Sequence, residues 1–112
     1  NLKNYDVIIF LNTTGDILDN AQQLEFERYI HAGGGFVGIH AASDTEYERP
    51  WYGKMVGAYF NGHPNNPNVR EAKVQRVNKE HISTKHLPDV WLRSDEWYNF
   101  KNINPNELRR WH

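Results

Sequence analysis

The stretch GGGFVGIHAA, residues 33–42, determines the fold expected of this chain. Its three glycines end a preceding helix, because glycine takes the left-handed conformation at a helix end without steric cost. The run from Phe36 to Ile39 is short and apolar, which is typical of a buried strand. His40 follows directly, with Gly38 and Ala42 two residues away on either side. The stretch therefore predicts a helix end, a strand at 35–39 and a sharp turn that carries a histidine.

The preceding residues supply the other half of this unit. Tyr5 to Leu11 reads YDVIIFL, a β-branched and aromatic run that predicts a strand buried on both faces. Asp19 and Gln22 match a capping box, which predicts a helix over 20–32. A strand, a capped helix and a strand at this spacing indicate a right-handed βαβ unit with parallel strands.

The expected helix has one apolar face. Phe26, Tyr29 and Ile30 share that face and are expected to be largely buried, whereas Glu25 and Arg28 are expected to be exposed.

Signals further along the chain are weaker. Arg49-Pro50-Trp51 could open a short helix with proline in its first turn. Residues 69–77 alternate only loosely, as in a weak strand. Val90 to Arg93 is a candidate strand that we expect to join the parallel sheet, the alternative being an antiparallel edge over 94–100. Residues 104–112 show no clear element.

Composition restricts the classes of function. The 112 residues suffice for one domain, and 38% hydrophobic with 13% aromatic content indicates a folded chain. A net charge of -1 argues against nucleic-acid binding, and no apolar run is long enough for a membrane span. Cysteine is absent, which excludes disulfides and thiolate chemistry and leaves both cytoplasm and periplasm open.

The pattern small-x-His-x-small around His40 resembles the Gly-x-Ser-x-Gly nucleophile elbow in its physical requirement. A tight turn forces one side chain outward and crowds the residues two positions away, so these must be small. His40 could then act as a general acid or base, as a metal ligand or as a hydrogen-bond donor. The alternative is a capping histidine in an ordinary βα turn.

Several other residues are candidates because they follow expected strand ends, where open parallel sheets bind ligands. Asp44 could orient the His40 ring, and Thr13 lies in the polar loop after the first strand. Glu96 is expected within reach of His40, because strands ending at Ile39 and Arg93 would place their loops on the same edge.

An aromatic wall is expected beside these groups, since aromatic faces match the apolar faces of sugars. Trp51 or Trp97 could supply it, and His63 is a further candidate for substrate binding. His81 and His86 do not show helical ligand spacing. The sequence contains no metal-binding spacing such as HExxH. No cofactor is therefore evident, and a divalent metal is kept as an alternative.

Five motifs in a fixed order closely resemble the ThuA-like (trehalose-utilisation) family from about residue 5 to about residue 105. They are FLNTTGD (10–16), GGGFVGIHAASDTEY (33–47), PWYGKMVGAYF (50–60), STKHLP (83–88) and SDEWYNF (94–100). The resemblance implies an α/β fold like class I glutamine amidotransferases, a flavodoxin-like three-layer arrangement with a mostly parallel open sheet and helices on both faces. Family domains are longer, so residues 1–112 are expected to form one partial domain.

The resemblance also implies carbohydrate catabolism on trehalose-related or 3-keto sugars, with a small-molecule carbohydrate as partner. Because His40 stands where the amidotransferases have cysteine, their thioester chemistry is not implied. An enzyme would use His40 as acid or base with Glu96 or Asp44 as partner, in a hydrolase, lyase or isomerase step. The alternatives are a non-catalytic sugar-binding or interaction module and, more weakly, a metal hydrolase.

Overall fold

The computed structural model describes residues 1–103, and the stretch from 104 onward lies outside the described residues. The chain forms a mixed α/β structure with small sheets. Its elements are η1 (Leu2–Asn4), β1 (Val7–Leu11), α1 (Asn20–His31), β2 (Gly35–Ile39), η2 (His40–Asp44), α2 (Pro50–Val56), β3 (Tyr59–Phe60), β4 (Val69–Gln75), β5 (Val90–Glu96) and β6 (Phe100–Lys101).

The strand–helix–strand order and the parallel pairing expected from the sequence are confirmed. The expectation that the first strand is buried on both faces is wrong, because Val7, Ile9 and Leu11 are exposed on one face. β1 and β2 are parallel, in a register that runs from Val7 opposite Gly35 to Leu11 opposite Ile39. The capping box is complete, because the Asp19 carboxylate accepts from the backbone N–H of Gln22 at 2.8 Å and the Gln22 side chain accepts from the Asp19 backbone N–H at 2.9 Å. The connection between the strands is therefore a helix with a well-defined start.

The apolar face of α1 packs as expected. Phe26 and Tyr29 are buried and Ile30 is half-buried, whereas Glu25 and Arg28 are exposed. Their partners in the core come from β1, η2, α2 and β3, and the buried cluster consists of Phe10, Phe26, Tyr29, Ala42, Tyr52 and Tyr59. Burial of these rings is the main favourable term for this body of the molecule.

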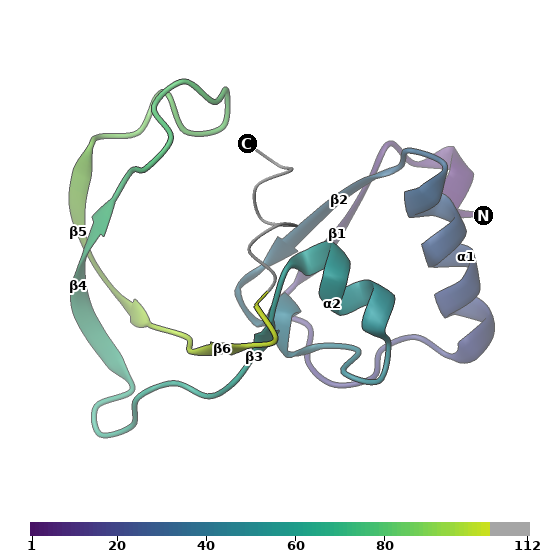
Figure 1. Cartoon of the computed structure of the whole chain (residues 1–112), viewed down its shortest axis with the longest axis horizontal. Helices are drawn as coiled ribbons and strands as arrows, with labels where there is room; N and C mark the ends of the chain where they lie inside the picture. Colours follow the sequence, from purple (N-terminus) through teal and green to yellow (C-terminus); the bar gives the residue numbers. More distant parts are fainter. Residues whose placement is uncertain (104–112) are drawn as a thin grey trace.

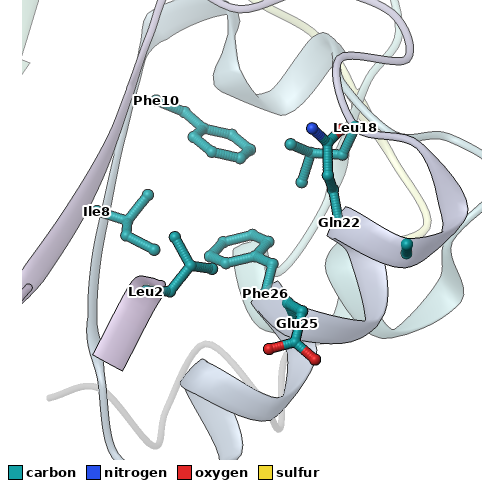
Figure 2. A pocket seen from close by; sticks show the side chains of 8 residues that line it. Leu2, Ile8, Phe10, Leu18, Gln22, Glu25 and Phe26 are labelled. Atoms are coloured by element: carbon teal, nitrogen blue, oxygen red, sulfur yellow. The ribbon is translucent and has the colours of Figure 1, made fainter. Parts of the chain in front are cut away.

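An apolar hollow of about 350 Å³ lies beside this core, between η1, β1 and α1. Figure 2 shows the rings of Phe10 and Phe26 with Leu2 and Ile8 on one side and Leu18 on the other. The two ring centroids are 5.2 Å apart. The hollow is lined almost wholly by apolar atoms, so it belongs to the packing of the core and offers few groups for chemistry.

β5 is not part of the parallel sheet, so the expectation that residues 90–93 join it is wrong. β5 pairs antiparallel with β4, from Val69 opposite Glu96 to Gln75 opposite Val90. The physical reason is visible in its sequence, VWLRSDE, which mixes apolar and charged residues. A strand buried between two layers of helices needs a continuous apolar run instead.

A short antiparallel pair connects this β4–β5 hairpin to the body. β3 pairs with β6, with Tyr59 opposite Lys101 and Phe60 opposite Phe100. In Figure 1 the hairpin projects to the left of the βαβ unit, and β3 and β6 lie between them. This pair brings the residues just after β5 beside the turn that follows β2. No helix within residues 1–103 is long and apolar enough to cross a membrane.

Candidate functional site

His40 occupies the strained turn that the sequence predicts. It follows β2 directly and has a φ of 51°, in the left-handed region that non-glycine residues rarely adopt. A Cβ atom on Gly38 would lie 3.1 Å from the Cβ of Ala42 and 3.3 Å from the Phe36 ring. Small residues are therefore required on both sides of the histidine, and the turn pushes the imidazole outward.

The imidazole lines a pocket of about 570 Å³, which we call the elbow pocket. The residues that line it come from β2, η2, the end of α2 and the segment around β5 and β6. They are Gly38, His40, Ala42, Ser43, Val56, Ala58, Asp95, Glu96, Trp97, Tyr98, Phe100 and Ile103. The volume falls within the range of small-molecule sites, and the lining combines an aromatic wall with a few polar groups.

Both ring nitrogens of His40 have polar neighbours. Nδ1 lies 3.0 Å from the hydroxyl of Tyr98, and Nε2 lies 3.8 Å from Oδ1 of Asp95. The His40 side chain is 32% exposed and that of Asp95 28%, so the pair is open to a ligand without being fully solvated.

Asp95 is held as a carboxylate. The Arg93 guanidinium, which donates to Oδ2 at 2.8 Å, is the first cause of a lowered Asp95 pKa. The backbone N–H of Glu96 also lowers this pKa by donating to Oδ1 at 2.9 Å, and His40 adds a smaller contribution. A negative charge therefore lies 3.8 Å from Nε2 of His40.

Tyr98 is held as a neutral phenol. Desolvation is the first cause of its raised pKa, and the nearby carboxylates of Glu96, Asp44 and Asp95 raise it further. A phenol hydroxyl can donate or accept a hydrogen bond. Both neutral tautomers of His40 are therefore supported, and in the Nδ1–H tautomer the Nε2 lone pair is free to accept a proton.

A second histidine lies against the same tyrosine. The rings of His63 and Tyr98 are nearly parallel, with centroids 6.0 Å apart. Nε2 of His63 lies 3.9 Å from Oε1 of Glu96. The two adjacent carboxylates at the end of β5 therefore have different neighbours, Asp95 beside His40 and Glu96 beside His63, although both line the elbow pocket. Two histidine–carboxylate pairs therefore lie around Tyr98.

The other candidates from the sequence take different positions. The Asp44 carboxylate accepts a hydrogen bond from the hydroxyl of Tyr47 and makes no hydrogen bond to His40. The hydroxyl of Thr13 lies 3.0 Å from that of Thr45, away from the lining of the elbow pocket.

Of the two tryptophans considered for the aromatic wall, Trp97 lines the elbow pocket and Trp51 does not. Trp51 packs edge-on against Phe26, with ring centroids 5.4 Å apart. His81 and His86 lie in the loop between β4 and β5, outside the pocket lining. Within the described part of the chain, no three histidine, aspartate or glutamate side chains are arranged to hold a metal ion.

Sequence reasoning missed two members of the site, Asp95 and Tyr98. Both belong to the motif SDEWYNF, from which the sequence analysis chose Glu96 and Trp97, which also line the pocket, but not these two residues. Which of the adjacent acids faces His40 depends on how the β3–β6 pair places the end of β5 beside η2, which no local pattern in the sequence specifies.

Comparisons with known proteins agree on one family. A sequence model of ThuA, described as trehalose utilisation, matches residues 1–110. No curated protein matches the chain. The crystal structure of a ThuA-like protein from Bacteroides uniformis ATCC 8492 matches with a TM-score of 0.77 and 36% sequence identity. The match covers 91% of this chain and 42% of that one, so the present chain spans less than half of that relative.

Proposed function

Because this chain belongs to the ThuA family, described as trehalose utilisation, we propose that its elbow pocket binds a trehalose-related or 3-keto sugar and transfers a proton on it. The observation that carries the proposal is the His40 ring, which lies in a strained turn between the Tyr98 hydroxyl and the Asp95 carboxylate. Strained backbone conformations cluster at functional sites, where the surrounding structure must compensate for them.

The geometry suits proton abstraction from a carbon next to a ketone. In its Nδ1–H tautomer, His40 presents the Nε2 lone pair as the base, and Asp95 stabilises the resulting imidazolium. The Tyr98 hydroxyl holds the ring orientation by accepting from Nδ1. Trp97 contributes an aromatic surface of the kind on which the apolar face of a sugar ring can lie. Such a step is common to lyase and isomerase reactions on keto sugars.

The other residues singled out from the sequence have supporting roles in this proposal. Asp44 fixes Tyr47, and the contact of Thr13 with Thr45 ties the loop after β1 to η2. Both help to shape the carboxyl edge of the β1–β2 pair, where the pocket opens. Asp95 replaces Glu96 as the proposed partner of His40, because it is the carboxylate beside Nε2.

Deuterium exchange tests the proposal without assuming the final product. In D₂O, the protein should exchange the hydrogens next to the ketone of 3-keto-trehalose for deuterium. The loss of their ¹H NMR signals measures the rate of this exchange. His40→Ala should slow this exchange by about 10²- to 10⁴-fold, the usual contribution of a general base. Tyr98→Phe keeps the ring and should slow it less. His86→Ala, at an exposed histidine outside the pocket, is the matched control and should leave it unchanged.

The same assay separates the alternatives. If the wild-type protein binds the sugar and shows no exchange, the pocket is a binding module without turnover. If His40→Ala keeps the wild-type exchange rate while its free energy of unfolding is also unchanged, His40 is not the base.

We further propose that in the complete family domain β1 and β2 belong to a mostly parallel open sheet of the class I glutamine amidotransferase type, with helices covering both of its faces. The support is one apolar face of this pair, which is exposed in the present chain and consists of Val7, Ile9, Leu11, Val37 and Ile39. Parallel sheets are normally covered on both faces. A crystal structure of a longer protein that contains this chain would contradict the proposal if that face remained in solvent.

A further inference from the structure

The pair formed by His63 and Glu96 differs from the pair formed by His40 and Asp95 in one respect that bears on ligand binding. Nδ1 of His63 lies 2.9 Å from the carbonyl oxygen of Pro64. A carbonyl oxygen can only accept a hydrogen bond, so this ring nitrogen must carry the proton. The neutral tautomer of His63 is therefore fixed, whereas the Tyr98 hydroxyl allows both tautomers of His40.

With the proton fixed on Nδ1, the other ring nitrogen of His63, Nε2, faces a group with which it cannot form a hydrogen bond. In neutral His63, Nε2 carries a lone pair, and it faces Oε1 of Glu96 across 3.9 Å. Both atoms are then acceptors, and no hydrogen bond between them is possible. The Glu96 carboxylate is held in this position by the side chain of Asn68, whose Nδ2 donates to Oε1 at 2.9 Å. A carboxylate can accept more than one hydrogen bond, so both the Glu96 carboxylate and Nε2 of neutral His63 can accept from the hydroxyl groups of a ligand.

We propose that His63 and Glu96 form a subsite for two adjacent hydroxyl groups of the sugar, one donating to Nε2 of His63 and the other to the Glu96 carboxylate. A vicinal diol supplies two O–H donors at the spacing of neighbouring ring carbons, which suits two acceptors 3.9 Å apart. This inference rests on the proposed function, because it assigns the sugar-binding part of the same site.

The position of the pair supports this assignment. Glu96 lines the elbow pocket together with His40, and His63 lies at its edge, outside the lining residues but beside Glu96 and Tyr98, so a sugar held by its diol would extend toward the proposed base. The side chains of His63 and Glu96 are 24% and 29% exposed, which leaves them accessible to a ligand. Phe60 and Tyr98, with ring centroids 4.4 Å apart, form an aromatic support beside His63, against which an apolar sugar face can pack.

The first test concerns the tautomer. In the ligand-free protein, ¹⁵N NMR of the histidine side chains at pH 8.5 should show His63 with its proton on Nδ1. Addition of trehalose should shift the Nε2 resonance, since this nitrogen then accepts a hydrogen bond. An imidazolium at this pH would overturn the proposal, because His63 and Glu96 would then satisfy each other as an ion pair.

The second test measures binding of trehalose by NMR titration in a His40→Ala background, which lacks the proposed base. His63→Phe keeps an aromatic ring without its acceptor, and Glu96→Gln removes the charge. Each should weaken binding by about 10- to 100-fold, as expected for loss of a hydrogen bond to a charged or buried acceptor. Glu71→Gln, at an exposed glutamate on β4, is the matched control and should bind as the parent does.

Deoxy sugars complete the test. Each monodeoxy trehalose lacks a single hydroxyl. One of them should bind the parent as weakly as trehalose binds the Glu96→Gln variant. The affinity of that deoxy sugar should fall little further when Glu96→Gln is introduced. Equal binding by all variants would overturn the subsite. If binding depends on His63 and Glu96 while the wild-type protein shows no deuterium exchange, the subsite stands and the proposed catalytic function fails.

Discussion

The contact between Gly53 and Tyr59 allows the sharpest prediction about stability. Gly53 lies inside α2, and a Cβ atom placed on it would be only 2.3 Å from Cε2 and 2.6 Å from Cζ of the Tyr59 ring. That ring is 6% exposed, and its hydroxyl donates to the carbonyl oxygen of Arg49 at 2.7 Å. Gly53→Ala must therefore displace a buried ring that is held at its far end.

The expected cost follows from three contributions. Overpacking a core costs about 1–3 kcal/mol, and losing the tyrosine hydrogen bond adds about 1 kcal/mol. The better helix propensity of alanine offsets about 1 kcal/mol. Gly53→Ala should therefore lower the free energy of unfolding by about 1–3 kcal/mol, measured by urea denaturation with tryptophan fluorescence.

A double-mutant cycle separates the clash from other effects. Tyr59→Leu removes the ring atoms that Cβ would meet, so Gly53→Ala should cost much less in that background and could even stabilise the helix. The same cost in both backgrounds, or a single-mutant cost below about 0.5 kcal/mol, would refute the reasoning. If Gly53→Ala alone does not fold, recovery of folding in the Tyr59→Leu background would still identify the clash.

Two further predictions concern the helix face and the hairpin. Phe26→Ala should lower the free energy of unfolding by about 3–5 kcal/mol, because Phe26 is 2% exposed at the centre of the core. Leu24→Ala, at a residue that is 55% exposed, should change it by no more than about 0.5 kcal/mol. Equal effects of the two substitutions in thermal or urea unfolding would contradict the assigned face. Asp89→Asn should destabilise the protein at pH 7, because hydrogen bonds from Lys79 and then Arg76 lower the pKa of the Asp89 carboxyl. A carboxyl whose pKa is lowered by folding stabilises the folded state at any pH above its ordinary, unfolded-state pKa. The difference from wild type should vanish as the pH falls through the folded-state pKa, and a difference that persists at low pH would exclude the ion pairs as its cause.

The βαβ unit could be predicted because its signals are local. The apolar run before Leu11, the capping box at Asp19 and the glycines before Phe36 each act over a few residues, and they agree with one another. The turn at His40 was predictable for the same reason, since the need for small neighbours at 38 and 42 is a matter of local sterics. Secondary structure that depends on neighbouring residues can be read from one sequence.

The position of the second half of the site could not be derived in this way. We expected Glu96 near His40 because β5 would share a parallel sheet with β2, and that pairing is wrong. Glu96 nevertheless lines the same pocket, because the β3–β6 pair brings the end of the hairpin beside η2. A two-residue pairing between segments about forty residues apart has no local signature, and only the folded chain reveals it.

The sequence by itself therefore determined the βαβ unit, the histidine at its sharp turn and the resemblance that identifies the family. Only the tertiary structure decided which groups surround that histidine, with Asp95 at Nε2 and Tyr98 at Nδ1, and that His63 and Glu96 form a second pair. The physical reason is that these contacts join residues far apart in the sequence. The β3–β6 pair, which brings the end of β5 beside η2, has no local signature in the sequence.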